Sequence, residues 1–486
     1  MMDKKRLLAG LLAAVLTVAS LSGCGEKKNE NEDGIGEVSW YLSGVKLDSS
    51  YDDVWNKMNG LLGERYGLKL NINLIDGSNF SQKVQMMNAS QEAYDLAFTS
   101  NWTNNYHTNV TNGSLLDLTD KLPEVTPKLW EMMSDAERRA VTVDGKIYAV
   151  PNWQVQARAM GFSFPKEKFE LTGMSLEEIN GFDDLEKYYE KLYSIEPELA
   201  AGNGSNWQTA MTNYGMITVV QEGLPGVIYY NKTGKPQIVN QFATPEFMEF
   251  CKMVHGWVKK GYLPDVKSNK SYVGTGVIRQ MGGWNNWKPG IGREEARRVN
   301  YDVVDKQISP AVLATETLLS TMTGVSANSK NPDNALKILE IMRTDKEIYN
   351  ILSWGLEGVN YEKTGENTIK VKEESTYSMA NWAVGSVENS YILDGNSESI
   401  WEETRKFNDS AIVSPLIGFT FNNESILAEL GNCETVIKEY IDVLQHGQVD
   451  PETTIPEFLK ELEIAGVDHV LEEVQKQIDA WWEGKD

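Results

Sequence analysis

Basic residues and histidine are scarce in this sequence of 486 residues. Lysine and arginine total 46 against 70 aspartates and glutamates, which gives a formal net charge of −24. A surface this acidic repels nucleic-acid phosphates and anionic lipids, so we expect no nucleic-acid partner. The four histidines lie far apart in the sequence, without cysteine or histidine partners at the spacing of metal ligands. We therefore expect no metal site.

Motifs of the common enzyme classes are also missing. The sequence contains no G-x-S-x-G nucleophile elbow and no G-x-x-x-x-G-K-[ST] phosphate loop. The glycines at 274–276 and 281–283 do not form a dinucleotide fingerprint, and the oxygen-rich loop 394–398 lacks the acid spacing of a calcium loop. We expect no cofactor and no enzymatic activity.

Cysteine is rare, with only Cys24, Cys251 and Cys433 in the chain. Cys251 lies on the apolar face of a helical pattern over 247–254, which favours a buried free thiol. The spacing leaves a disulfide with Cys433 open, although a chain of this length does not need a single disulfide to hold its core.

Long apolar runs are limited to one, at 7–20, which follows the basic head 3–6. A run of fourteen residues is too short to span a membrane, which needs about 20, so it predicts an export signal. The following Leu-Ser-Gly-Cys resembles the bacterial lipobox, in which the cysteine is lipidated and the chain is cut just before it. That resemblance implies a signal peptide at 1–23 and a lipid anchor of the palmitate type on Cys24. An ordinary secretory signal with an incidental cysteine is the alternative.

The chain after Cys24 begins with a polar stretch and continues with a long globular part. Residues 24–36 have almost no apolar side chains beyond the cysteine, so we expect a flexible tether. The remaining chain of about 450 residues is too long for one core and favours two domains. A hydrophobic content of 41% and an aromatic content of 10% are typical of a well-packed soluble protein.

Strand and helix patterns alternate from residue 37 onward. Strands are expected at 38–42, 68–75 and 95–98, with helices at 54–62 and 80–87 between them. This alternation predicts an α/β unit with a largely parallel sheet. Asp144-Gly145 supplies a tight hairpin turn within 143–151. Further helices are expected at 185–192, 247–258, 334–343 and 470–481.

Several stretches carry a family resemblance that spans nearly the whole chain. After the lipobox and tether, residues 94–98 (YDLAF) look like a strand that leads into a ligand loop. Residues 144–151 (DGKIYAVP) are similar to a G-K-x-Y-A-x-P hairpin, and 325–335 (VSANSKNPDNA) to a strand followed by an N-P-x-x-A helix start. Together they resemble the extracellular solute-binding proteins of ABC importers, especially the sugar-binding lipoproteins. Residues 354–361 (WGLEGVNY) and 465–479 resemble a subgroup associated with complex-sugar uptake.

The resemblance implies a two-lobed, periplasmic-binding-protein-like (type II) α/β fold with the ligand cleft between the lobes. Lobe one would comprise 37–151 completed by about 320–360, and lobe two 152–319 completed by about 361–486. It further implies a monomer, anchored through Cys24 on the extracellular face of the cytoplasmic membrane. Such a protein captures a carbohydrate, here an oligosaccharide, and delivers it to the permease subunits of an ABC transporter.

The fourteen tryptophans supply the candidate ligand contacts. Those in helical patterns are interpreted as packing residues, namely Trp55, Trp130, Trp257, Trp481 and Trp482, whereas Trp40 fits either role. Eight others lie in or beside loops, most of them next to Asn, Gly or Glu: Trp102, Trp153, Trp207, Trp284, Trp287, Trp354, Trp382 and Trp401. An indole can lie flat on the C–H face of a sugar, and amide or carboxylate groups can pair with its hydroxyls. The alternative is that these tryptophans cover the lobe cores. We single out Trp102, Trp153, Trp284 and Trp354, with the polar candidates Asn101, Asn104, Gln154, Asn285 and Glu357.

Three other functions fit parts of the sequence. An exported glycoside-acting enzyme needs a pair of carboxylates about 5–10 Å apart, and the 70 acidic residues leave such a pair open. A peptide receptor of the same architecture would need charged groups for the peptide termini. A structural surface lipoprotein would bind no ligand.

Overall fold

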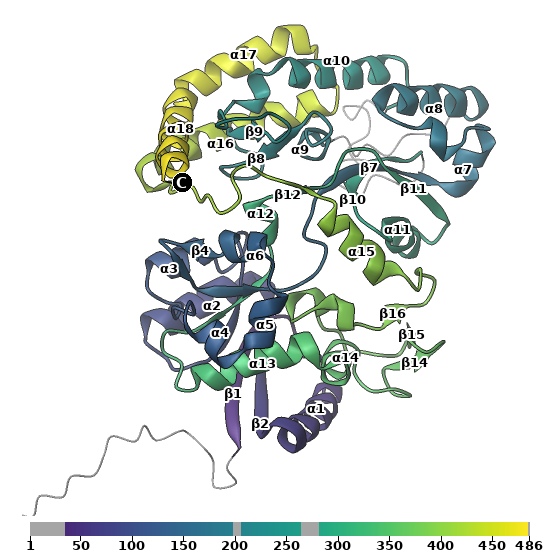
Figure 1. Cartoon of the computed structure of the whole chain (residues 1–486). Helices are drawn as coiled ribbons and strands as arrows, with labels where there is room; N and C mark the ends of the chain where they lie inside the picture. The colour runs from purple at the N-terminus through teal and green to yellow at the C-terminus, as the bar shows by residue number, and fades with distance from the viewer. Residues whose placement is uncertain (1–34, 198–205, 264–280, 485–486) are drawn as a thin grey trace, which may run out of the picture.

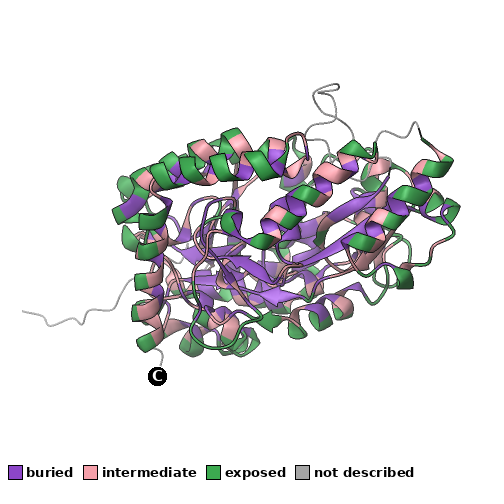
Figure 2. Ribbon diagram, turned by 90° about the horizontal axis from the view of Figure 1, so that it is seen from above, coloured by how far each residue is buried: buried purple, intermediate pink, exposed green. Residues whose placement is uncertain are grey.

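A computed structural model describes residues 35–197, 206–263 and 281–484 as two lobes, one above the other in Figure 1. The expected signal peptide, Cys24 and nearly all of the tether lie outside the described residues. Figure 2 shows buried strands covered by helices whose outer faces are exposed, so each lobe has a layered α/β arrangement.

The first lobe is built on a five-stranded sheet. Its order is β2-β1-β3-β13-β6, in which β1 is parallel to β2 and β3, and β13 is antiparallel to β3 and β6. The strands are β1 (Gly36–Ser43), β2 (Leu68–Ile75), β3 (Leu96–Thr99), β6 (Ala149–Pro151) and β13 (Met322–Val325). The three strands expected from the first hundred residues are confirmed, and the return segment supplies β13.

Helices cover this sheet and complete the first core. The long ones are α1 (Ser50–Tyr66), α2 (Gly77–Ala89), α13 (Pro332–Thr344) and α14 (Lys346–Trp354). Shorter helices join β3 to the hairpin β4 (Thr142–Val143) and β5 (Lys146–Ile147): α3 (Tyr106–Thr111), α4 (Lys121–Val125), α5 (Pro127–Met132) and α6 (Asp135–Ala140). Helix α1 ends at Gly67, whose φ of 64° is left-handed, so glycine stops the helix without a Cβ penalty.

The second lobe contains a three-stranded antiparallel sheet in the order β10-β7-β11. Its strands are β7 (Ala159–Pro165), β10 (Gly283–Trp287) and β11 (Val303–Gln307), beside the hairpin β8 (Met216–Thr218) and β9 (Val227–Tyr229). Its helices are α7 (Lys166–Leu171), α8 (Phe182–Ile195), α9 (Trp207–Ala210), α10 (Pro245–Lys259) and α11 (Ile291–Val299), followed at the C-terminal end by α16 (Leu427–Gln445), α17 (Pro451–Ile464) and α18 (Val467–Glu483). The C-terminal helices lie on this lobe beside α10 (Figure 1). Cys251 and Cys433 are both buried free thiols, which confirms the expectation for Cys251.

Three chain segments cross between the lobes, and they are hydrogen-bonded to one another. The first exits from β6, the second contains β12 (Val312–Leu313) and the third contains β17 (Ile412–Val413). Strands β12 and β17 pair in parallel, and the Arg158 amide donates to the Val312 carbonyl oxygen at 2.9 Å. The three crossings therefore form one small sheet-like junction.

The chain between the second and third crossings contributes elements on both sides of the junction. It includes α15 (Ile400–Asp409) and a small sheet of β14 (Tyr361–Lys363), β15 (Thr368–Val371) and β16 (Ile392–Leu393), whereas α12 (Thr315–Leu318) belongs to the second crossing segment. The boundary expected at about residue 360 lies later in the structure, because Tyr377, Ala383 and Val384 pack in the first core. Their buried side chains, rather than the end of α14, define where the first lobe ends.

Candidate functional site

Two tryptophans form an exposed aromatic platform on the first lobe. Trp102 follows β3 and is 60% exposed, and Trp382 is 38% exposed. Their ring centroids lie 6.4 Å apart, and both rings lie 5.9 Å from the ring of the buried Phe98. Apolar rings this exposed are costly to leave in water, which makes the pair a candidate contact surface for a ligand.

The conformation of the turn after β3 fixes the position of Trp102. The Ser100 hydroxyl accepts hydrogen bonds from the amides of Trp102 and Thr103, and the Trp102 indole nitrogen donates to the carbonyl oxygen of Ser320 at 2.8 Å. Ser320 belongs to the second crossing segment. The indole is therefore held at the junction with one edge bound and its faces available.

Four of the candidates from the sequence gather around the second crossing segment. Beside Trp102, the Asn101 side chain donates to the Glu316 carbonyl oxygen at 3.0 Å, and Gln154 donates to the Thr321 hydroxyl at 3.2 Å. Trp153, half-buried, exchanges backbone hydrogen bonds with residues 385 and 387, shortly after Trp382.

Trp354 also lies in this part of the first lobe. Its indole nitrogen donates to the Ser390 hydroxyl at 2.9 Å, and the side-chain amide of Asn381 lies 3.5 Å from the same oxygen. Asn381 directly precedes Trp382. The Trp401 indole of α15 donates to the Ser390 carbonyl oxygen at 2.8 Å. Ser390 therefore links three aromatic segments that are far apart in the sequence.

Two candidates from the sequence are structural residues. Trp284 is 3% exposed in the second core, edge-on to Phe182 and Phe250, because it lies on the inner face of β10 rather than in a loop. Asn104 is 2% exposed, and its side chain donates to the Phe98 carbonyl oxygen at 2.7 Å within the turn after β3. Neither side chain can meet a ligand in this arrangement.

The remaining two candidates lie outside this group. Asn285 is on β10, where its amide nitrogen donates to the Ser163 hydroxyl at 2.6 Å. Glu357 is exposed after α14, and its carboxylate lies 3.6 Å from the Lys363 ammonium. Neither contacts the Trp102 and Trp382 rings through a described interaction.

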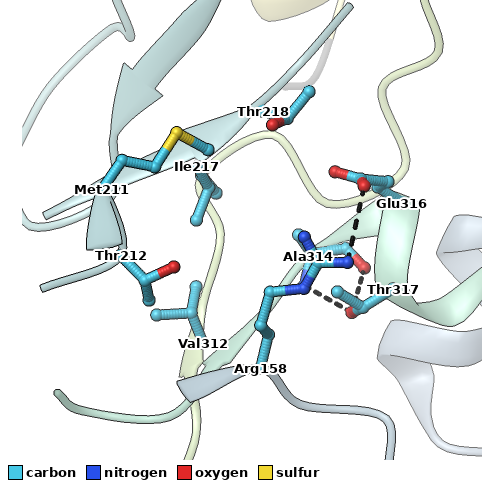
Figure 3. Close-up of a pocket in the computed structure, with 9 residues that line it drawn as sticks. All are labelled: Arg158, Met211, Thr212, Ile217, Thr218, Val312, Ala314, Glu316 and Thr317. Carbon is cyan, nitrogen blue, oxygen red and sulfur yellow. Dashed lines mark hydrogen bonds and ion pairs between the residues drawn. The ribbon is translucent and has the colours of Figure 1, made fainter. Parts of the chain in front are cut away.

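A small pocket lies where the second lobe meets the junction (Figure 3). The second lobe contributes residues between Met211 and Thr218, while Arg158, Val312 and Glu316 come from the first two crossing segments. The Arg158 guanidinium lies 3.8 Å from a carboxylate oxygen of Glu316 and 3.8 Å from one of Glu222.

The charged side chains of the pocket are only partly accessible. Burial raises the pKa of Glu316, the Arg158 charge opposes that rise, and the Glu222 charge adds to it. Sequence reasoning missed Arg158 and Glu316, and it named Trp382 only among the eight loop tryptophans without singling it out, because nothing in the local pattern distinguishes an acid or a tryptophan at the junction from one on the surface.

The arrangement is suited to binding a polar, uncharged molecule with apolar faces. Flat indoles, amide groups and a carboxylate beside a guanidinium together match the C–H faces and hydroxyl groups of a sugar. Among the described residues, no group of three or more His, Cys, Asp or Glu side chains could hold a metal ion. No helix in the described ranges is long and apolar enough to cross a membrane.

Comparison with known proteins gives a family match over the C-terminal part and relatives that match nearly the whole chain. Residues 415–483 match a family described as a domain of unknown function, DUF3502. The chain is 27% identical over 490 residues to a carbohydrate ABC transporter substrate-binding protein of Streptococcus pneumoniae, covering 97% of each chain.

Solved structures with the same fold include the N-glycan transport solute-binding protein NgtS of Streptococcus pneumoniae. It superposes with a TM-score of 0.79 at 26% identity, covering 93% of this chain and 100% of that one. The same protein in complex with Man5GlcNAc superposes with a TM-score of 0.66 at 26% identity, over 93% and 99% of the two chains. An extracellular solute-binding protein of Bifidobacterium longum subsp. infantis, at 15% identity, shares the fold with a TM-score of 0.59 over 93% and 99%.

Proposed function

We propose that this chain, a full-length homologue of the solute-binding proteins of carbohydrate ABC transporters, captures an oligosaccharide for import. The observation that carries the proposal is the exposed Trp102 and Trp382 pair beside the first two crossing segments. The Trp102 indole nitrogen donates to Ser320 of the second crossing segment, so a ligand on this platform lies at the junction. The homologues are binding proteins and not enzymes, so binding rather than turnover is the function that the comparisons favour.

The proposed mechanism is lobe closure around the sugar. A ligand that contacts both lobes binds the closed form more tightly and shifts the population toward it. The NgtS structures with a named sugar superpose less closely on this chain than the first one does. The TM-score against this chain falls from 0.79 to 0.66 for the Man5GlcNAc complex, while identity and coverage are nearly unchanged. A rotation of the lobes about the junction would produce such a difference.

We propose that the ligand contains mannose and N-acetylglucosamine. NgtS has been crystallised with Man1GlcNAc and with Man5GlcNAc, and this chain is about one quarter identical to it over nearly its full length. The platform and the amide groups of Asn101 and Gln154 supply the contacts that such sugars require. The candidates Trp153 and Trp354 extend the same surface.

The cellular context follows from the family and the N-terminal sequence. ABC substrate-binding proteins of this kind are extracellular. We propose that Cys24 carries a lipid anchor after removal of 1–23, and that a monomer presents its closed form to the permease subunits. Mass spectrometry of the protein purified from its own membrane tests the anchor, because diacylglycerol on Cys24 adds a defined mass that Cys24→Ser abolishes.

Calorimetric titration of the purified protein tests the function. We expect Man1GlcNAc and Man5GlcNAc to bind with one-to-one stoichiometry, while a tripeptide does not bind. Small-angle scattering should show a smaller radius of gyration in the bound state. Binding of the peptide alone would favour the peptide receptor, and release of shorter sugars from Man5GlcNAc would favour the glycoside-acting enzyme.

A further inference from the structure

The pocket at the junction combines one apolar wall with one charged pair. Met211, Ile217 and Val312 supply the apolar wall. The Arg158 guanidinium and the Glu316 carboxylate lie at the other side, as Figure 3 shows. A fully apolar group would leave the charges unsolvated, and a fully polar group would leave the wall without a partner. The pocket therefore fits a small group that has one apolar side and one hydrogen-bonding side.

The Arg158 and Glu316 side chains can each form further hydrogen bonds. Their separation of 3.8 Å is longer than a direct hydrogen bond, and within the described ranges neither charged end makes another hydrogen bond. Arg158 can donate and Glu316 can accept without breaking an existing bond. A ligand that supplies one acceptor and one donor would satisfy both groups at once.

We propose that this pocket is the subsite for the acetamido group of an N-acetylhexosamine residue, an inference that rests on the proposed function. The acetamido carbonyl oxygen accepts from Arg158, its N–H donates to Glu316, and its methyl group packs on Met211, Ile217 and Val312. Each of its three parts thus has a partner among the lining residues.

Local charge distinguishes this group from the other substituents of natural sugars. Arg158 lies between two carboxylates, those of Glu316 and Glu222, so the fixed charge of the three side chains is already negative. A uronic or sialic acid carboxylate would be repelled by Glu316 and Glu222. A hydroxyl group at the same carbon is neutral, but it has no methyl to cover the apolar wall.

The pocket is also adjacent to the aromatic platform. The backbone carbonyl of Glu316 accepts from the side chain of Asn101, and Asn101 directly precedes Trp102. One sugar ring can therefore lie over the Trp102 indole while a ring linked to it directs its acetamido group toward Glu316. The subsite and the platform would then contact two neighbouring sugar residues of one oligosaccharide.

The test is a matched pair of disaccharides measured by calorimetry on the wild-type protein. One is Man1GlcNAc, and the other is the same mannoside with glucose in place of N-acetylglucosamine. We expect Man1GlcNAc to bind at least tenfold more tightly. Equal affinities, or a preference for the glucose analogue, would overturn the acetamido subsite and leave the proposed function standing. If neither disaccharide nor Man5GlcNAc bound, the proposed function would fail with it.

Variants of the pocket make the assignment specific. Ala314 lines the pocket in an extended conformation, with φ −126° and ψ 160°. Valine is compatible with this backbone, so Ala314→Val fills part of the pocket without backbone strain. We expect A314V and E316Q each to reduce the preference for Man1GlcNAc at least fivefold. The matched control is E294Q, which removes an exposed acid paired with Lys288 on α11 of the same lobe, and which should change the preference less than twofold. A preference unchanged in both A314V and E316Q would contradict the assignment.

Discussion

Trp102 and Trp382 stand side by side on the first lobe, although one follows β3 and the other lies in the turn Asn381–Ala383, far along the chain. The contact joins segments that are distant in the sequence into one surface. Both indoles keep exposed area while Phe98 supports them from within the lobe. This is the geometry of a binding platform, whose rings are fixed before the ligand arrives.

Removing either ring should weaken sugar binding more than it weakens folding. We expect Trp102→Ala and Trp382→Ala each to cost about 1.5–3 kcal/mol of binding free energy, because a rigid aromatic contact is lost. Calorimetric titration with Man5GlcNAc measures this change. The control is Trp130→Ala, since Trp130 lies on α5 and packs against the Arg138 guanidinium. Wild-type affinity in both platform variants would show that the sugar binds elsewhere.

Trp284 should show the opposite behaviour. Its ring is enclosed by the aromatic core of the second lobe, and its indole nitrogen donates to the Asn206 carbonyl oxygen at 3.1 Å. Trp284→Ala leaves a large cavity and should lower the free energy of unfolding by about 3–5 kcal/mol. Urea denaturation measures the loss, and Trp102→Ala serves as the exposed comparison, with an expected change below about 1 kcal/mol. Similar stabilities of the two variants would contradict the buried position of Trp284.

The buried ion pair of Glu137 and Arg343 anchors the first crossing segment. Its charged atoms lie 3.7 Å apart with both side chains 2% exposed, Gln156 donates to Glu137 at 2.7 Å, and Arg343 donates to the Pro151 carbonyl oxygen. Burial lowers the pKa of Arg343, while the Glu137 charge opposes that shift. Glu137→Gln would leave an uncompensated buried cation, at a cost of about 3–5 kcal/mol of stability.

The double variant E137Q/R343M separates the charge effect from packing. Removing both charges should restore part of the stability lost in E137Q, because no unpaired charge then remains in the core. Chemical denaturation of the two single variants and the double variant completes the thermodynamic cycle. Strictly additive losses would mean that the two charges do not interact.

His107 should make stability depend on pH in the mildly acidic range. Burial lowers the pKa of His107 from 6.5 to about 4, and its ring packs edge-on against Tyr106 at 5.1 Å. Between these two values the unfolded chain binds a proton that the folded chain does not, so the free energy of unfolding falls as the pH falls.

The partly buried position of His107 makes this contribution about 2 kcal/mol between neutral pH and pH 4. We expect His107→Gln to remove that part of the pH dependence while the rest of the profile keeps its shape. Urea denaturation at pH 7.5 and pH 5.0 compares the two proteins. Parallel pH profiles of the wild type and H107Q would contradict the shifted pKa.

The regular elements could be predicted from the sequence because their signals are local. The alternation of 68–75 and the helical spacing that ends at Gly67 correspond to β2 and α1. The end of the first lobe could not be predicted in this way. Whether Tyr377 packs in one core or the other depends on tertiary contacts, and its hydroxyl donates to the Leu352 carbonyl oxygen on α14.

The candidate site was predictable only in part, because the burial of a side chain depends on tertiary contacts. Trp102 was identified from its place after a strand, where the carboxyl ends of parallel strands meet. The sequence wrongly predicts a loop position for Trp284, because the glycines before it are typical of a loop. In the structure Gly283 pairs with Ser163 in the sheet, and Gly282 has a φ of 82° where a Cβ would meet the Ser163 carbonyl oxygen at 2.6 Å. In this chain the glycines allow close packing beside a core tryptophan. A glycine-rich loop has the same sequence pattern, so the sequence does not distinguish the two.

The position of β13 between β3 and β6 has a consequence for how the chain acquires its structure. Among the described residues β13 is the only neighbour of β6 in this sheet, so β6 can pair only after residues 159–321 have been synthesised. The N-terminal 151 residues should therefore not fold autonomously, and both halves should mature together through contacts of long sequence separation. Until then the inner edge of β3 is open to pairing with another molecule, which makes newly made chains dependent on protection from aggregation.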